Sequence, residues 1–339
     1  MAFTTATVSS ISDLFTQLDT FLLAQGWSTD LDAASGQWAA WKNVSGSVWV
    51  TMAVQWDTGS PEWVGVYQWH GAAYSSASDQ WAQNDDSGNG EPTTSNSTLD
   101  NQRNVYLDTC NKFWCFEDTN YFHIVVRYSV ATGGYKYMHF GSGYLDKYSD
   151  WTGGEYCYGQ LVSSTNIKGQ VNAGASYALD GLSADSSPYL DMEERVATLH
   201  IEGMNDQAGT SKWGVCMGNQ SSSNLGTDRG ANARIHIVGG FRSGPFASNF
   251  GTLSGSYGRG LVPLYPIVPL FWNRTTDNQE GPLGVMPDVR GVSLANFEAE
   301  DSVTVGSDTW VVFPTHRRLD SGTATGYTGF QGLAYKQVS

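Results

Sequence analysis

Two histidines, His123 and His139, lie in neighbouring segments in which apolar and polar residues alternate. This alternation is typical of adjacent β-strands, so the two imidazoles could converge on one sheet face and bind a metal ion. No acidic or thiolate residue shares an obvious register with them. Because hydrogen bonds easily satisfy a neutral imidazole, we favour two hydrogen-bonded sheet histidines over a metal site.

A short acidic segment at residues 85–96 is similar to the start of a calcium-binding loop. Asp85, Ser87, Asn89 and Gly90 occupy the first, third, fifth and sixth positions of such a loop. The twelfth position, where a calcium loop needs a bidentate glutamate, is Asn96. This mismatch favours a solvated loop over a calcium site.

Three carboxylates near a tryptophan are the best candidates for acid–base catalysis. Asp146, Asp150 and Glu155 flank Trp151, and paired carboxylates beside an aromatic ring are used in glycoside hydrolysis. No motif singles out one of them as an acid or a nucleophile. The phosphate-binding glycine patterns, the nucleophile elbow G-x-S-x-G and the metalloprotease motif H-E-x-x-H do not occur. We therefore expect a protein that is not an enzyme and that holds no cofactor.

The spacing of the four cysteines, Cys110, Cys115, Cys157 and Cys216, does not match the usual zinc-ligand pairs. The chain does not begin with a basic segment followed by an apolar one, so we expect synthesis in the cytoplasm. In that compartment the four cysteines are expected to be buried, reduced thiols.

The net charge of −15 argues against a protein that binds nucleic acid, because such a charge repels phosphates. The longest apolar run, residues 261–272, is interrupted by three prolines and is too short for a membrane helix. We therefore expect neither specific nucleic-acid binding nor membrane insertion.

The elements that must position these residues are mostly strands. Residues 10–25 predict one amphipathic helix, with Ser10 as its cap and Gly26 at its end. Hairpins are predicted from residues 47–56 with 62–69, and from 121–129 with 135–140. Further strands are expected within 195–201, 234–238, 261–271 and 309–313.

These elements predict a mainly β (α+β) fold of antiparallel sheets or a sandwich, with an N-terminal amphipathic helix and long loops. A change in composition divides the chain into a Trp-rich β domain at 1–165 and a Gly- and Ser-rich β domain at 166–339. One composite domain is the alternative to this division.

Aromatic residues make up 13% of the chain, and ten of its thirteen tryptophans precede residue 160. Most are expected in the core, while the others could form subunit interfaces or stack on sugars. The stripe that includes Leu14, Leu18 and Phe21 is expected to be buried in its own sheet or in a neighbouring subunit. The polar segment 83–101 predicts an arm, held through Pro92 and Leu99 by another subunit or by its own domain. Together with Trp151, these five residues are the interface candidates.

Several blocks resemble structural proteins of tailed-bacteriophage virions, especially tail and baseplate components. They are SDLFTQLDTFLLAQGW at 12–27, FGSGYLDKYSDWTGG at 140–154, GVMPDVRGV at 284–292 and GSDTWVVFPTHRR at 306–318. The resemblance implies a subunit that assembles in the host bacterial cytoplasm into a symmetric ring or sleeve, with copies of itself and other virion proteins. It leaves open the tail tip, the baseplate, the neck and head decoration. The alternative function is a receptor-binding module that stacks host surface glycans on exposed tryptophans.

Overall fold

The computed structural model describes the chain in fifteen segments. These are residues 1–31, 38–42, 51–57, 63–69, 103–105, 110–129, 135–151, 153–158, 197–201, 213–216, 233–238, 264–273, 280–294, 297–314 and 331–337.

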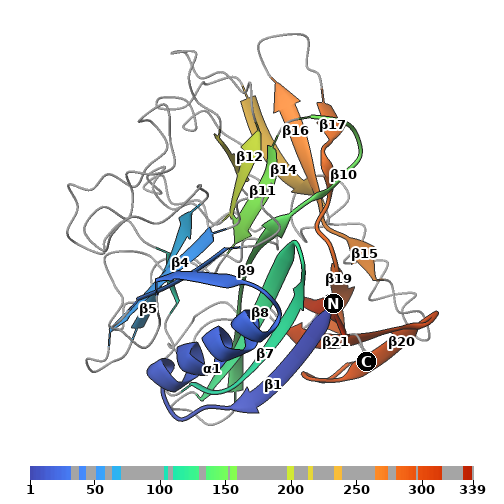
Figure 1. Ribbon diagram of the computed structural model, residues 1–339. Coiled ribbons are helices and arrows are strands. Elements are labelled where there is room, and N and C mark those ends of the chain that lie inside the picture. The colour runs from blue at the N-terminus through green and yellow to red at the C-terminus, as the bar shows by residue number, and fades with distance from the viewer. Residues whose placement is uncertain are drawn as a thin grey trace, which may run out of the picture.

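The described residues form three β-sheets, a two-stranded pair and one helix (Figure 1). The central sheet has the order β1 (Ala2–Thr7), β7 (Cys110–Asp118), β8 (Tyr121–Ser129), β9 (Tyr135–Tyr144), β11 (Gly153–Tyr158), β12 (Ala197–Ile201), β13 (Trp213–Cys216), β14 (Ala233–Val238), β16 (Val268–Asn273) and β17 (Glu280–Pro282). The C-terminal sheet has the order β15 (Tyr265–Pro266), β19 (Val289–Ser293), β22 (Gln331–Gln337), β21 (Asp308–Pro314) and β20 (Ser302–Val305).

The N-terminal sheet has the order β2 (Ser28–Leu31), β3 (Trp38–Lys42), β4 (Thr51–Asp57), β5 (Trp63–Trp69) and β6 (Arg103–Val105). The short pair consists of β10 (Asp146–Lys147) and β18 (Gly284–Val285). Neighbouring described strands are antiparallel, except that β13 and β14 are parallel. The structure thus confirms the mainly β fold with antiparallel sheets. Among the described residues, no helix has the length and apolarity to cross a membrane.

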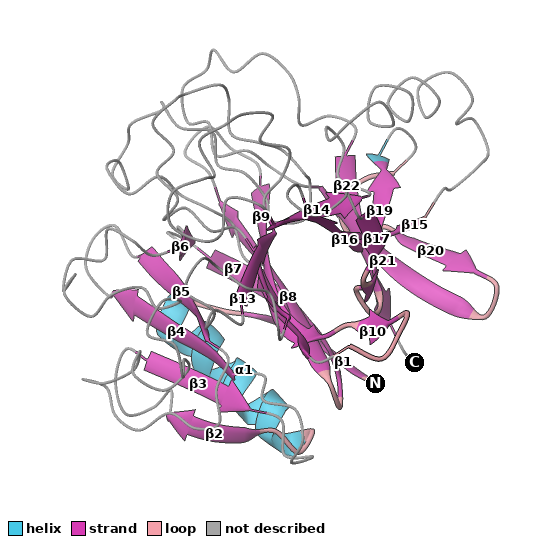
Figure 2. Ribbon diagram, turned by 90° about the horizontal axis from the view of Figure 1, so that it is seen from above, coloured by secondary structure: helices cyan, strands magenta, loops and turns pink. Residues whose placement is uncertain are grey.

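Strands β7, β8 and β9 are buried on both faces, because layers pack on each side of them. Successive side chains of a strand point to opposite faces. On β8, Phe122, Ile124 and Val126 therefore face the helix, while Tyr121 and Val125 face the C-terminal sheet. Seen from above, the helix and β2–β5 lie on one side of β8 and β19–β22 on the other (Figure 2).

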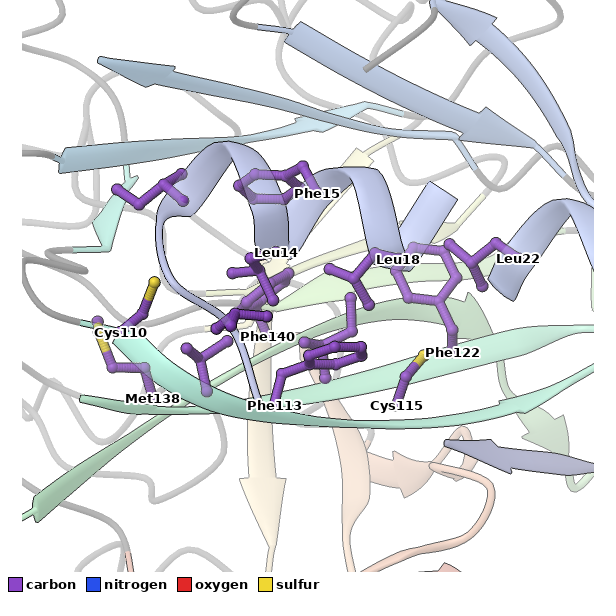
Figure 3. Close-up of a cluster of buried hydrophobic side chains, with 14 of the residues drawn as sticks. Leu14, Phe15, Leu18, Leu22, Cys110, Phe113, Cys115, Phe122, Met138 and Phe140 are labelled. Carbon is purple, nitrogen blue, oxygen red and sulfur yellow. The ribbon is translucent and has the colours of Figure 1, made fainter. Parts of the chain in front are cut away.

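The helix α1 (Ile11–Ala24) begins and ends where the sequence predicts. The hydroxyl of Ser10 accepts a hydrogen bond from the backbone N–H of Asp13, and Gly26 has a φ of +92°. Its apolar stripe packs on the central sheet (Figure 3). The buried residues of the stripe are Ile11, Leu14, Phe15, Leu18 and Leu22.

Both predicted hairpins are present, in β4 with β5 and in β8 with β9. Residues 47–50 of the first hairpin lie outside the described residues. The central sheet also joins strands from both sides of residue 165, because β11 pairs with β12. Several strands, among them β1, β7, β11, β19, β20 and β22, are described where the sequence analysis predicts no strand.

Candidate functional site

The chemically capable side chains that the structure brings together lie between the central and C-terminal sheets. We call this group the inter-sheet cluster. Its members are Tyr121, His123, Tyr137 and His139 from the central sheet, and Asp288, Glu300 and Tyr335 from the C-terminal side. Strand alternation positions the first four, since residues two apart on β8 or β9 point to the same face.

His123 ties β8 to the turn that precedes β19. Its Nε2 lies 2.8 Å from the carbonyl oxygen of Pro287, and a carbonyl can only accept, so Nε2 donates. The ring lies beside those of Tyr121, Tyr156 and Tyr335, with centroids 5.0 to 6.3 Å away. Burial lowers the pKa of His123 to about 3, against a weaker opposing effect of its hydrogen bond to Pro287. His123 is therefore neutral at neutral pH.

His139 makes the same kind of tie from the next strand. Its Nε2 donates to the carbonyl oxygen of Pro314 at 3.0 Å, so its Nδ1 accepts from the hydroxyl of Tyr335, also at 3.0 Å. The two rings stack with centroids 5.8 Å apart. The structure thus confirms two hydrogen-bonded sheet histidines. Among the described residues, no group of three or more acidic, histidine or cysteine side chains is arranged to hold a metal ion.

Asp288 follows Pro287 in the same turn and binds Tyr121, which lies two residues before His123 on β8. Its carboxylate accepts a hydrogen bond from the hydroxyl of Tyr121, and Lys336 lies 3.9 Å from its other oxygen. Burial, with the bond to Asp288, raises the pKa of Tyr121 well above its usual range. The turn thus accepts hydrogen bonds from both Tyr121 and His123.

Glu300 forms a second carboxylate tie farther along the interface. Its two oxygens accept from Lys112 at 2.9 Å, and from Arg127 and Tyr137 at 2.8 Å each. Burial disfavours the ionised carboxylate, but these hydrogen bonds outweigh it and lower the pKa of Glu300. Lys112 also lies 4.3 Å above the ring of Trp114. Cations of β7 and β8 therefore hold the loop between β19 and β20.

Aromatic rings fill the space between these polar ties. Phe116 stacks on Tyr335 with centroids 5.1 Å apart, and Trp114 meets Phe313 edge-on at 4.9 Å. The two histidines are almost without solvent exposure, and both nitrogens of His139 are engaged. This arrangement fastens one sheet to another and keeps His123 and His139 away from solvent.

The opposite face of the central sheet carries fewer polar contacts. Trp27 donates its indole N–H to the buried carboxylate of Glu117 at 2.8 Å, and burial raises the pKa of Glu117. Cys110 and Cys115 are buried thiols, as expected, and burial raises the pKa of Cys115 well above normal. The side chains of Cys157 and Cys216 lie outside the described residues.

Trp151 lies half-buried beside Leu283, the residue directly before β18. Its indole N–H donates to the carbonyl oxygen of Leu283 at 3.1 Å, and the same oxygen accepts from the backbone of Tyr148. Of the carboxylates suggested for catalysis, Asp146 and Asp150 are exposed, and the side chain of Glu155 lies outside the described residues. Partial burial, with the nearby charges of Asp288 and Asp118, raises the pKa of Asp146.

The remaining interface candidates fall into two groups. Leu14 and Leu18 have no exposed surface and pack in the chain's own core, while Phe21 is partly buried beside them. An intersubunit contact at α1 must therefore come from other residues of the helix. Pro92 and Leu99 lie outside the described residues, as do the whole segment 83–101 and the calcium-like loop 85–96.

Asp288, Glu300 and Tyr335 did not stand out in the sequence. Their partners lie 163 to 196 residues away in the chain. One local signal was available, since Pro287 and Asp288 form a turn-forming pair beside a strand. A comparison with protein-family models finds no match, and neither does a comparison with curated protein sequences.

Proposed function

We propose that this chain is a structural subunit of a tailed-phage virion, in the tail or baseplate region. It assembles into a symmetric oligomer with copies of itself and with other virion proteins. Its work is to bury surface against its neighbours.

The observation that carries this proposal is that the exposed side chains of α1 carry no charge. They are Ser12, Thr16, Thr20, Leu23 and Ala24. The two carboxylates of the helix, Asp13 and Asp19, are partly buried and accept hydrogen bonds within the chain. A surface helix usually carries charged or other polar residues on its outer face, and on α1 the exposed ones are the uncharged Ser12, Thr16 and Thr20. The centres of protein interfaces are instead depleted of charge, so this surface is suited to contact with another subunit.

Several polar side chains of α1 make hydrogen bonds within the chain, which makes the outer surface less polar than its composition suggests. The hydroxyls of Thr16 and Thr20 donate to backbone carbonyls one turn earlier, at 2.8 Å each. Asp19 accepts from Thr29 and from Trp41. The threonines can therefore present their methyl groups outward.

The arrangement of the resembling blocks is a second support. Residues 12–27 form α1 and its exit, while 140–154 and 284–292 meet where β10 pairs with β18. The fourth block includes β21 (Asp308–Pro314), next to β22 in the sheet that also holds β19. Three of the four blocks thus line the junction between the central and C-terminal sheets.

The proposal is tested by asking whether the chain is a fixed component of purified particles. Quantitative mass spectrometry of gradient-purified virions should find it at a constant copy number that a high-salt wash does not change. The persistence is expected because salt screens charge pairs and leaves apolar contacts intact. A chain that is abundant in the lysate and absent from the particles would contradict the proposal.

Exposed aromatic surface favours glycan binding as a second candidate function. Tyr148 is 56% exposed and lies beside Trp151 on the same carbonyl of Leu283. Rings of this kind can stack on sugars. Titration with soluble host-surface glycans should quench or shift the tryptophan fluorescence of the chain. The fluorescence of a Tyr148→Ser, Trp151→Leu double variant should stay the same in this titration. The absence of any glycan response in the unaltered chain would remove this candidate.

A further inference from the structure

Strand β1 forms an open edge of the central sheet. In the described part of the chain it pairs with β7 alone, in an unbroken register from Ala2 opposite Glu117 to Thr7 opposite Lys112 (Figure 1). An edge strand presents a row of unpaired backbone groups, which can template pairing with another strand. The outer side of β1 is therefore a surface of hydrogen-bond donors and acceptors.

The hydrogen bonds at the end of β1 reveal which residues face outward. The N–H of Val8 donates to the carbonyl of Asn111 at 3.1 Å, so Val8 faces β7. In an antiparallel ladder the direction alternates with each residue. Phe3, Thr5 and Thr7 therefore direct their N–H and C=O groups away from β7. The Gln17 side chain donates to the carbonyl oxygen of Thr7 at 3.3 Å, which agrees with this orientation. This bond takes one of the two lone pairs of that outward carbonyl and leaves the other for a further donor.

The other sheet edges carry the features that normally prevent strand pairing. Natural edges are protected by charge, proline, bulges or very short strands. Strand β17 contains Glu280 and Pro282, and β15 has two residues and ends in Pro266. Among the described strands, the remaining edges of the three sheets are β2, which has Asp30 and a bulge, β6, which is a three-residue strand with Arg103, and β20, which has only four residues.

Strand β1 has none of these features. It is six residues long, its pairing with β7 has no bulge, and it contains no proline. No charged side chain occurs from residue 2 to residue 12. Its outward threonines, Thr5 and Thr7, are both exposed.

We propose that β1 pairs antiparallel with β1 of a second copy of the chain, which joins two central sheets into one. The proposal rests on the assembly function proposed above and names its contact. The outward groups fix the register around a two-fold axis. Thr5 faces Thr5 of the second copy, and Phe3 faces Thr7.

The occupant is a second copy because the strand is complementary to itself. An isologous contact places the same patch on both sides, so a charged residue near its centre would meet its own charge. Like charges directly opposite each other destabilise a strand pair. The neutral sequence of β1 avoids this repulsion, and the pairing also brings the uncharged outer surfaces of the two α1 helices to the same side of the joined sheet.

The first test places a charge or a proline on the outer edge. Thr5→Lys sets two cations opposite each other, and Thr5→Pro removes an N–H that does not bond to β7. Mass photometry and sedimentation velocity of the full chain should show the apparent dissociation constant of the dimeric contact raised at least about tenfold in both variants. Thr304→Lys, on the exposed edge of β20, is the matched control and should assemble like the unaltered chain. Circular dichroism and thermal unfolding verify that each variant is folded.

The second test reads the register. Thr5→Cys removes the hydrogen bond that the Thr5 hydroxyl donates to the carbonyl oxygen of Phe113 at 2.8 Å, so thermal unfolding verifies its fold as for the other variants. In a hydrogen-bonded antiparallel pair the two Cα atoms lie about 5.5 Å apart, within the range that a disulfide spans. Thr5→Cys should therefore form a covalent dimer on mild oxidation. Thr7→Cys should not, because the two Thr7 residues lie at opposite ends of the pair. The unaltered chain gives the background from its native cysteines.

The outcomes separate this inference from the proposed function. If the unaltered chain assembles and the Thr5→Lys and Thr5→Pro variants assemble equally well, the β1 contact is wrong and the assembly function stands. A Thr5→Cys chain that assembles and gives no cross-link above background also overturns the β1 pairing. If the unaltered chain never associates, the assembly function itself fails. Loss of association in the Thr5 variants, with a Thr5-specific cross-link, supports the proposal.

Discussion

Asp288 and Glu300 are the described non-glycine residues with a left-handed backbone, at φ values of 50° and 73°. Such a conformation costs a residue with a Cβ about 1 kcal/mol or more. Each carboxylate accepts a hydrogen bond from a tyrosine of the central sheet, Tyr121 for Asp288 and Tyr137 for Glu300. The unfavourable backbone therefore occurs where it aims a carboxylate across the interface.

The buried His123 should make stability depend on pH. Its pKa is about 3 in the fold and about 6.5 when unfolded, so the unfolded chain binds the proton more readily. This residue's contribution to the free energy of unfolding should fall by about 1.4 kcal/mol per pH unit between these values as the pH decreases. Urea unfolding of the unaltered chain and of His123→Gln should show a shallower loss in the variant. An identical pH dependence would contradict the assignment.

Removing the charge of Glu300 should weaken the tie between the sheets. Glu300→Gln leaves Lys112 and Arg127 without an ionised partner and should lower the free energy of unfolding by about 1–3 kcal/mol at pH 7. Because its pKa is lowered in the fold, this contribution is present above the unfolded value and lost as the pH falls through the folded value. The exposed Glu298, in the same loop, provides the control Glu298→Gln, which should change stability by less than about 0.5 kcal/mol. Equal effects of the two substitutions would rule out the tie.

At the scale of elements, α1 shows how one segment serves two surfaces. Its inner stripe fills the core on β7–β9, while its outer side carries Thr16, Thr20 and Leu23 without charge. Burial of the stripe within the same chain means that the chain's own core holds α1 in place. In the proposed assembly, its outer side is a preformed contact surface.

The two sides of α1 should respond differently to truncation. Leu18→Ala removes a fully buried side chain and should destabilise the fold by about 2–5 kcal/mol. Leu23→Ala, at a residue that is 45% exposed, should change stability by less than about 0.5 kcal/mol. Chemical denaturation of both variants measures the difference. A Leu18→Ala chain as stable as the Leu23→Ala chain would show that the stripe is not in the core.

Local sequence patterns predicted those elements whose caps or alternation lie within one short segment of the chain. The cap Ser10 and the terminal Gly26 defined α1, and strict alternation defined β8 and β9. Strand β1 did not stand out because its threonines and alanines lack a clear apolar alternation. Glycine-containing strands such as β11, β19 and β22 gave equally weak patterns.

The inter-sheet cluster could be predicted only in part. Adjacent strands with a shared alternation were enough to place His123 and His139 on one sheet as hydrogen-bonded residues. Their acceptors, Pro287 and Pro314, are 164 and 175 residues away, and nothing in a single sequence pairs residues at that distance. The cations that hold Glu300 were hidden for the same reason.

At the scale of the whole molecule, the packing on the two faces of the central sheet should change in stability in opposite directions as the pH falls. On the α1 side, burial raises the pKa of Glu117, so its protonation adds stability as the pH falls. On the other face, the pKa values of His123 and Glu300 are lowered, so their contribution to the stability of the interface with the C-terminal sheet is lost as the pH falls. The attachment of the C-terminal sheet is therefore the more acid-sensitive of the two.

Hydrogen exchange can follow this difference directly. Between pH 7 and pH 4, the protection of β19, β21 and β22 should fall by a larger factor than that of α1, once rates are corrected for intrinsic exchange. The cause is local opening at the weaker interface. Uniform loss of protection in both regions, or earlier loss in α1, would contradict the assignment.

The central claim is that this chain is built to assemble, and the most direct measurement is its stoichiometry in solution. Native mass spectrometry of the full chain, over a wide range of concentrations, should show one oligomer whose mass is a defined multiple of the 36.8 kDa subunit mass. The fraction of the chain in this oligomer should increase as the concentration rises. A closed symmetric oligomer predicts a single dominant stoichiometry. A folded chain that remains a monomer at every concentration would contradict the account.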